Sequence, residues 1–250
     1  MNSGLVGRCA LITGATSGIG HATAIALSQK GARVLVSGRN VDRGSAVVES
    51  IRSAGGQAEF LRAELNGGSS ARVLAQRALE ASDGAVDILV NNAGAGAVGP
   101  TAEFDESELD ALLAVNVKVP FYLVAELAPA MAARQRGSII NVSSMAAQVG
   151  MAGMSAYGAT KAALNMLTRH WTAEFGHLGV RVNGVSPGTV RTPAVSGIDE
   201  VTIEAMAAQI PARRIASPEQ VAAAIAFLAS DDASHIYGAV IDVDGGASAV

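Results

Sequence analysis

Thr13-Gly14-Ala15-Thr16-Ser17-Gly18-Ile19-Gly20 is the stretch that decides the fold of this chain. It follows a short apolar run and opens a segment of helical period. Glycines let the backbone turn sharply and let a pyrophosphate approach closely, and the first free amides of a helix attract an anion. The stretch therefore predicts a phosphate-binding turn between a strand and a helix. Because its spacing is G-x-x-x-G-x-G and not the commoner G-x-G-x-x-G, a merely structural tight turn is the alternative.

The alternation of apolar runs and helical segments continues along the chain. The expected strands are residues 9–13, 33–37, 58–61, 86–91, 138–143, 180–185 and 239–243. The expected helices are residues 18–30, 42–54, 69–82, 107–134 (broken near 118–120), 157–177 and 218–230. Several strands are nearly continuous in Val, Ile and Leu, which is typical of strands covered on both faces. We therefore predict the α/β class, with one doubly wound Rossmann-type domain over residues 1–250. Its seven-stranded parallel sheet carries helices on both faces.

A longer connection at residues 193–216 interrupts this alternation, with a weak helical pattern at 200–209. Connections of that length in compact domains are usually functional. Ligands of such sheets bind beyond the carboxyl ends of the strands, where this segment begins. We predict a substrate lid, with a plain surface insertion as the alternative.

Composition and charge exclude several classes of protein. The formal net charge of −4 gives no basic footprint for nucleic acid. The chain has no run of eighteen apolar residues and no secretory signal pattern, so we expect no membrane segment. Cys9 is the single cysteine, which excludes an intramolecular disulfide and favours the cytoplasm. We predict it to be an apolar filler of a buried strand. The four histidines show no metal-ligand spacing, so no metal site is expected.

Further motifs follow the glycine turn in order. They are Asn91-Asn92-Ala93-Gly94, then Asn116, Ser144, Tyr157-Gly158-Ala159-Thr160-Lys161, Pro187-Gly188-Thr189-Val190-Arg191-Thr192 and Asp244-Gly245-Gly246. In order and spacing this set resembles the short-chain dehydrogenase/reductase family over nearly the whole chain. The resemblance implies an oxidoreductase that moves a hydride between NADP(H) and a carbonyl or alcohol substrate.

The resemblance also implies a set of cofactor-binding residues. These are Gly14, Thr16, Ser17, Gly18, Ile19, Gly20, Ser37, Arg39, Asn40, Glu64, Leu65, Asn92, Ala93, Gly94, Tyr157, Lys161, Pro187, Gly188, Val190 and Thr192. Glu64 stands where family members often place an Asp near the adenine.

The end of the second expected strand indicates which nicotinamide cofactor is used. An acid there accepts hydrogen bonds from a ribose 2′-hydroxyl and repels a 2′-phosphate, whereas an arginine does the reverse. NAD-preferring relatives carry Asp at the position of Gly38, and here Arg39 follows this glycine. With Ser37 and Asn40 as secondary donors, Arg39 favours NADP(H), although NAD(H) stays possible. The alternative is that Arg39 is a solvated charge or stacks only on the adenine.

Tyr157 and Lys161 are four residues apart and so share one face of a helix. A surface pair is the ordinary explanation of that spacing. An ammonium within about 4–6 Å of a phenol favours the phenolate and pulls its pKa toward the operating range. By resemblance, Tyr157 gives a proton to the carbonyl oxygen and Lys161 also holds the nicotinamide ribose.

Two further roles follow from the same resemblance. Ser144 would hydrogen-bond the substrate oxygen. Asn116 would anchor a water that links Lys161 to solvent. Because strand alternation lets only one of two adjacent serines point into the site, Ser143 is the competing residue, and the family spacing selects Ser144.

The expected pocket walls, at residues 94–98, 145–154 and beyond Pro193, are mostly small or apolar. This lining suits an apolar or moderately polar ketone or secondary alcohol, and Gln148 could supply one orienting hydrogen bond.

Two other functions stay open. In 3-oxoacyl carrier-protein reductases, basic residues tend to occupy the positions of Gln135 and Leu178, for which Arg134 and Arg136 could substitute. A non-catalytic NADP-binding scaffold or sensor is the remote alternative, because all four catalytic positions are intact.

The alanine-rich helices at 107–134 and 157–177, with residues 218–250, imply a homotetramer by resemblance. Burial of these helices within one subunit is the alternative.

Overall fold

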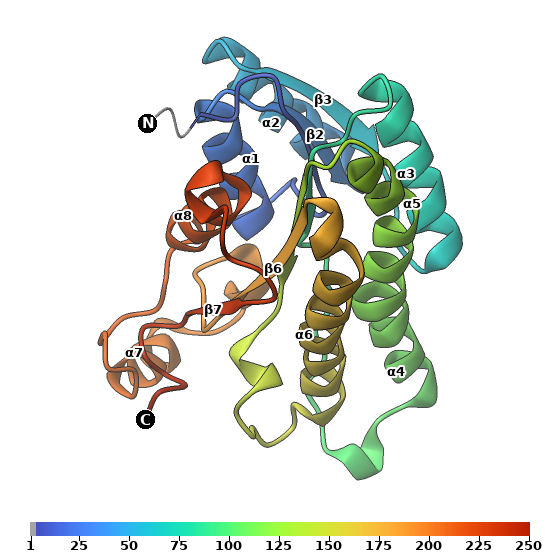
Figure 1. Cartoon of the computed structure of the whole chain (residues 1–250). Coiled ribbons are helices and arrows are strands. Elements are labelled where there is room, and N and C mark those ends of the chain that lie inside the picture. The colour runs from blue at the N-terminus through green and yellow to red at the C-terminus, as the bar shows by residue number, and fades with distance from the viewer. Residues whose placement is uncertain (1–3) are drawn as a thin grey trace.

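A computed structural model describes residues 4–250 and shows one parallel sheet with helices on both sides (Figure 1). Its strand order is β3-β2-β1-β4-β5-β6-β7, and every neighbouring pair is parallel. The strands are β1 (Cys9–Ile12), β2 (Arg33–Gly38), β3 (Gln57–Arg62), β4 (Ile88–Asn91), β5 (Gly137–Val142), β6 (Val180–Pro187) and β7 (Val240–Val243). The chain reverses its direction of winding between β1 and β4, which is the topology predicted from the sequence.

The helices cover the two faces of this sheet. They are α1 (Gly18–Gln29), α2 (Val41–Ser53), α3 (Gly68–Ala81), α4 (Glu106–Leu113), α5 (Val119–Ala133), α6 (Ser155–Phe175), α7 (Glu200–Ala208) and α8 (Pro218–Ala229). One core lies under α1, α2 and α8, and the other lies under α3, α5 and α6. Successive strand residues serve the two cores alternately: Ala10 and Ile12 join the first, and Cys9 and Leu11 the second. Cys9 is thus a buried filler, as predicted.

The expected break near residues 118–120 is absent. α4 and α5 are instead joined by a π-helical turn, Ala114–Lys118, and Pro120 lies just after this turn. By length and apolar composition alone, the continuous helix Glu106–Ala133 could cross a membrane, although the sequence predicted no membrane segment. Here Leu123, Leu127 and Met131 are buried against the sheet, as in a core helix of a layered fold.

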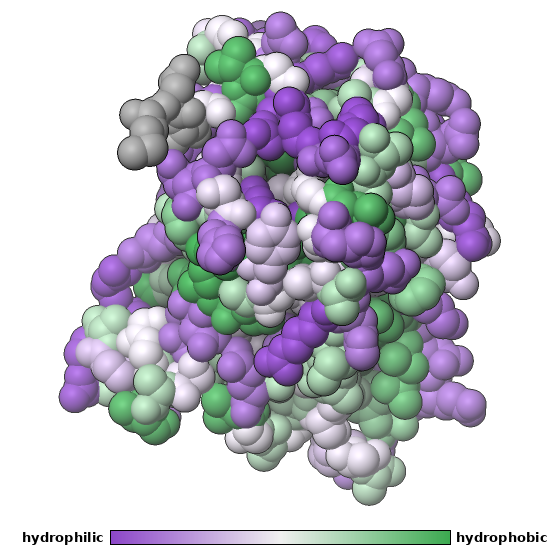
Figure 2. All heavy atoms as spheres, viewed as in Figure 1, coloured by the Kyte–Doolittle hydropathy of each residue, from purple (hydrophilic) through white to green (hydrophobic). Residues whose placement is uncertain are grey.

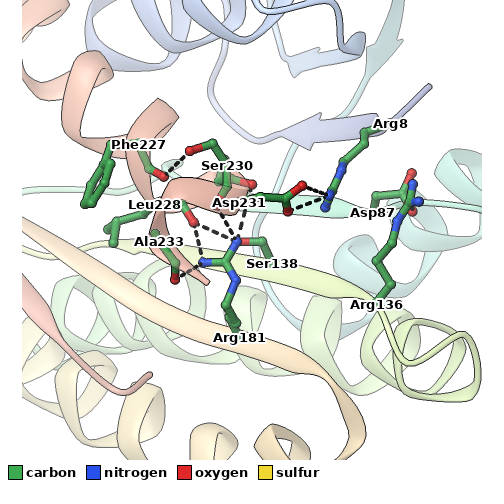
Figure 3. A network of polar contacts seen from close by, with 11 residues as sticks. Arg8, Asp87, Arg136, Ser138, Arg181, Phe227, Leu228, Ser230, Asp231 and Ala233 are labelled. Atoms are coloured by element: carbon green, nitrogen blue, oxygen red, sulfur yellow. Dashed lines mark hydrogen bonds and ion pairs between the residues drawn. The ribbon is translucent and has the colours of Figure 1, made fainter. Parts of the chain in front are cut away.

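A buried arginine holds the carboxyl end of α8 (Figure 3). Arg181, on β6, donates to the carbonyl oxygens of Leu228, Ala229, Ser230 and Ala233 at distances of 2.6 to 3.4 Å. Leu228 and Ala229 are the last residues of α8, where carbonyls have no partner within the helix, and Ser230 and Ala233 lie in the turn that follows. The corner after α8 is therefore attached directly to the sheet.

The connection after β6 protrudes from the layers as α7 (Figure 1). It has a small apolar cluster of its own, formed by Ile203, Ile210 and Ile215. An ion pair of 2.8 Å joins Arg191, before the connection, to Glu200 at the start of α7. Hydrophobic surface is visible around α7 and the C-terminus (Figure 2), where Val201 and Val250 are exposed.

Candidate active site

The glycine turn lies at the carboxyl end of β1, and its glycines are required by space as well as by conformation. Gly14 and Gly18 have φ values of +63° and +54°, which disfavour other residues. A Cβ atom at Gly20 would lie 2.4 Å from the Gly14 oxygen and 2.5 Å from Asn92 Nδ2. Any side chain at position 20 would therefore displace the turn.

Asn92, at the end of β4, ties this turn to the neighbouring strand. Its Nδ2 donates to the Thr13 oxygen at 2.8 Å and to the Gly14 oxygen at 3.1 Å. The Thr13 hydroxyl in turn accepts from the backbone amides of Asn92 and Ala93. These hydrogen bonds fix the turn to β4, and the other side of the turn faces a groove.

The groove encloses about 400 Å³ and contains most of the predicted cofactor residues. Its walls are formed by Gly14, Thr16, Ser17, Gly18, Ile19, Gly38, Arg39, Asn40, Arg43, Ala63, Leu65, Asn92, Ala93, Gly94, Ala95, Val115, Thr192 and Pro193. Arg43 was missed in the sequence. It lies in the first turn of α2, whose N-cap is Asn40, and the position of a basic residue just after this cap was the available signal.

Ser37 and Glu64, both in the predicted cofactor set, do not line this groove. Ser37 is fully buried, and within residues 4–250 its hydroxyl has no hydrogen-bond partner, so it does not reach the groove. Glu64 is exposed, and its neighbours Ala63 and Leu65 line the groove in its place. For Glu64 the reason is that adjacent residues of an extended chain point to opposite sides, so Ala63 and Leu65 face the groove.

Position 38 has no room for a side chain. A Cβ atom there would lie 2.5 Å from Thr16 Cγ2. The acid that selects a free ribose hydroxyl is therefore excluded sterically. Asn40 accepts a hydrogen bond from the Arg43 amide at 2.8 Å and caps α2.

The loop after β6 closes the other side of the groove. A Cβ atom at Gly18 would lie 3.1 Å from Thr192 Cγ2, so Thr192 faces the glycine turn across the groove. Val190 bridges to Ala216, which attaches the loop to the far end of the lid connection. Pro187, Gly188 and Val190 do not line the groove, and Gly188 packs against the Asp244 backbone.

Tyr157 and Lys161 meet near the end of β5. Lys161 is 4% exposed, its Nζ donates to the Val142 oxygen at 2.9 Å, and it lies 5.8 Å from the centre of the Tyr157 ring. Burial lowers the Lys161 pKa to about 8. Burial also raises the Tyr157 pKa, and a hydrogen bond to Ser144 opposes that rise. Without a bound cofactor, Lys161 is not among the causes that shift the Tyr157 pKa, and its ammonium is turned onto the Val142 oxygen.

The two adjacent serines have different surroundings. The Ser143 hydroxyl donates to the Lys161 carbonyl oxygen at 3.5 Å and is buried. Ser144 accepts from the Ala146 amide at 3.2 Å, and its hydroxyl lies near enough to Tyr157 to oppose the rise of the phenol pKa. Ser144 is the one of the pair that reaches the phenol.

Asn116 lies in the π-helical turn, a feature that is frequent at functional sites. Its side chain accepts from the Ala95 amide and donates to the Ala95 oxygen, both at 2.9 Å, and donates to the Thr160 hydroxyl at 3.0 Å. A Cβ atom at Gly94 would lie 3.3 Å from Asn116 Oδ1 and 3.4 Å from Lys161 Nζ. Asn116 and Lys161 therefore border the same small space.

Two basic residues considered for carrier binding turn the other way. Arg134 donates to the Gly84 and Val86 oxygens, and Arg136 contacts Asp87 at 3.4 Å (Figure 3 shows Arg136 and Asp87). These contacts lie at the amino edge of the sheet, opposite Ser144, so within one chain neither arginine borders the site. Within residues 4–250, no three His, Cys, Asp or Glu side chains are grouped as metal ligands.

Comparison with known proteins identifies the family of this chain. The sequence profile of the family described as Enoyl-(Acyl carrier protein) reductase matches residues 14–248. A solved structure named short chain dehydrogenase/reductase family protein is 44% identical, with a TM-score of 0.90 over 98% of this chain and 99% of its own. The chain belongs to the short-chain dehydrogenase/reductase family.

Two other members of the family carry more specific names. Cis-4-hydroxycyclohexanecarboxylate dehydrogenase of Sinomonas cyclohexanicum is 39% identical over the whole of both chains. The gluconate 5-dehydrogenase of Burkholderia cenocepacia J2315, solved with NADP and tartrate, is 31% identical, with a TM-score of 0.93 over 100% of this chain and 98% of its own. The fold and family read from the sequence are thus confirmed.

Proposed function

We propose that this protein is an NADP(H)-dependent oxidoreductase that interconverts a ketone and a secondary alcohol. The observation that carries the proposal is the contact of Ser144, Tyr157 and Lys161 beside a glycine-lined groove. The bound dinucleotide would supply or accept the hydride at the substrate carbon.

The groove fits a dinucleotide with a 2′-phosphate. The turn from Gly14 to Gly20 offers backbone amides at the start of α1, where an anion is favoured. Arg39 and Arg43 line the far end of the groove, and Gly38 excludes a competing acid. NADP bound to the gluconate 5-dehydrogenase supports the same assignment.

Tyr157 is the proposed acid in the reduction of a carbonyl. Because burial raises its pKa, the phenol is protonated at neutral pH and has a proton to give. The Ser144 hydroxyl would hydrogen-bond the same substrate oxygen as it gains negative charge. In alcohol oxidation, Tyr157 would accept the proton instead.

Lys161 and Asn116 are the proposed route by which the proton is replaced. A Lys161 pKa of about 8 lets the ammonium exchange its proton near neutrality. The space beside Gly94, bordered by Asn116 Oδ1 and Lys161 Nζ, would hold the connecting water.

The substrate is proposed to be apolar or moderately polar. Exposed Val98 and Met151 stand on the two loops beside the catalytic residues, and the connection at 193–216 would cover the substrate as a lid. A secondary alcohol on a carbon ring, as in the name of the Sinomonas enzyme, is one example of this class. Hydride transfer to a 3-oxoacyl group on a carrier protein has less support. The arginines that could bind the carrier, Arg134 and Arg136, are engaged at the opposite edge of the sheet.

We further propose that the chain is one catalytic domain that assembles as a cytoplasmic homotetramer through two surfaces, α5 with α6 and residues 218–250. Phe121 and Met166 are exposed on these two helices, and Phe121 lies 6.2 Å from Trp171 between ring centres.

A direct assay tests the proposed function. NADPH and NADH oxidation would be followed over ketones of graded size and polarity, with Tyr157→Phe as the control. We expect turnover with NADPH, higher kcat/KM than with NADH, and loss of turnover in the variant. Cofactor binding without turnover on any ketone or alcohol would indicate a scaffold. A higher kcat/KM with NADH would overturn the assignment of Arg39.

A further inference from the structure

Gln148 lies directly after the short 3₁₀ turn Met145–Ala147, whose N-cap is Ser144. At the start of this turn, the Ser144 oxygen atoms accept from the amides of Ala146 and Ala147. At its end, the Gln148 amide donates to the Met145 oxygen at 2.9 Å. The turn is therefore one rigid unit with Ser144 at one end and Gln148 at the other.

The side chain of Gln148 binds the sheet and not the substrate space. Its Nε2 donates to the Ser186 hydroxyl at 2.9 Å and to Asp242 Oδ1 at 2.7 Å. A primary amide nitrogen has two hydrogens, so both are used. The orienting hydrogen bond to substrate that the sequence suggested is thus not available from this nitrogen.

The two acceptors lie opposite each other on neighbouring strands. Ser186 of β6 pairs in register with Asp242 of β7, and Ser186 is fully buried. Ser186 immediately precedes Pro187 and Gly188, where the loop that closes the cofactor groove begins. One amide group therefore connects the Ser144 turn to the base of this loop.

We propose that Gln148 is a positioning residue, which holds Ser144 at its working distance from Tyr157 and from the loop after β6. The proposal for Gln148 rests on the proposed function only where it predicts a change in turnover. Its effect on the Tyr157 phenol is independent of turnover, because Ser144 hydrogen-bonds Tyr157 in the protein without substrate.

The first test replaces the amide and measures the phenol. Gln148→Met removes both hydrogen bonds and keeps the length of the side chain. We expect the Tyr157 pKa, followed by ultraviolet difference titration with Tyr157→Phe subtracted, to rise by about one unit, because a hydrogen bond to the phenolate is weakened. An unchanged Tyr157 pKa in a folded variant overturns the proposal. This titration stays decisive even if the wild-type protein turns over no ketone.

The second test replaces the amide donor at position 148 by a carboxylate and then restores a donor at position 242. Gln148→Glu places a carboxylate against Asp242, and two carboxylates at this distance share one proton only at low pH. We expect kcat to fall about 10- to 100-fold at pH 8, to recover as the pH is lowered toward 5, and KM for NADPH to change little. Asp242→Asn in the same chain restores a donor and should return kcat to within about threefold at pH 8. A pH profile like that of the wild type, or a loss that Asp242→Asn does not rescue, overturns the proposal.

Discussion

At the scale of single residues, position 38 shows how one missing side chain restricts the cofactor. The contact with Thr16 excludes any side chain, and so it excludes the acid that would favour NAD(H). A change of preference therefore needs two substitutions, not one.

We predict that Gly38→Asp alone weakens NADPH binding more than tenfold without tightening NADH, because the clash with Thr16 displaces the new carboxylate. Combined with Thr16→Ala, the same substitution should make NADH the tighter ligand. Calorimetric titration of both cofactors measures this. A single variant that already prefers NADH would contradict the steric argument.

Lys161 is a second residue at this scale, because its burial lowers the free energy of unfolding. Its pKa is lowered from 10.5 to about 8 by burial, so at pH 7 the folded protein holds an unfavourable buried charge. In the unfolded state, Lys161 keeps its proton up to about pH 10.5, whereas in the folded state it loses the proton near pH 8. The free energy of unfolding of the wild type therefore rises between these two pH values.

We predict that Lys161→Met abolishes turnover and raises the free energy of unfolding at pH 7 by about 1–2 kcal/mol. The gain of about 3 kcal/mol from the absent charge is reduced by loss of the hydrogen bond to the Val142 oxygen. Denaturant unfolding at pH 7 and pH 10 measures it, and the advantage should shrink at pH 10. A less stable variant at pH 7 would show that the ammonium is not penalised by burial.

At the scale of elements, α8 depends on the sheet for its carboxyl end. Arg181 is buried and binds the carbonyl oxygens of Leu228 and Ala229 at this end and of Ser230 and Ala233 just beyond it, whereas Arg8 pairs with the exposed carboxylate of Asp231 (Figure 3). The Arg8 side chain is also mostly buried, at 13% exposed, but it binds one carboxylate and no backbone carbonyl, which makes it the control for Arg181.

We predict that Arg181→Met lowers the free energy of unfolding by about 3 kcal/mol, because buried carbonyl oxygens lose their donors. Arg8→Ala should cost less than about 1 kcal/mol, because Asp231 is 66% exposed. Thermal and denaturant unfolding of both variants check the difference. Equal losses would mean that the helix end is not held by Arg181.

At the scale of the whole molecule, the outer face of α5 and α6 carries large exposed apolar side chains. Phe121 is 42% and Met166 47% exposed, on helices whose inner faces are buried in the core. Such a face is typical of a surface that a second copy covers.

We predict that Phe121→Asp reduces the molar mass measured by light scattering to that of a smaller assembly, because a charge would be buried in the interface. The exposed substitution Val73→Asp on α3 is the control and should leave the mass unchanged. A wild-type protein that is already monomeric at micromolar concentration would refute the homotetramer.

The sequence by itself determined the layered fold, the family and the glycine turn. The alternation of apolar runs and helical periods specified seven parallel strands, and the positive φ values of Gly14 and Gly18 are a local property of the turn. These signals are readable because backbone geometry and side-chain period act between residues close in the chain.

Only the tertiary structure decided which groups meet. It turned Ser37 and Glu64 away from the groove and placed Arg43 in its wall. It also joined Gln148 to Ser186 and Asp242, which are distant in the sequence. It also directed Lys161 onto the Val142 oxygen, which leaves burial to raise the Tyr157 pKa. The physical reason is that burial and hydrogen-bond partners depend on distances between separate elements, which no local pattern of residues encodes.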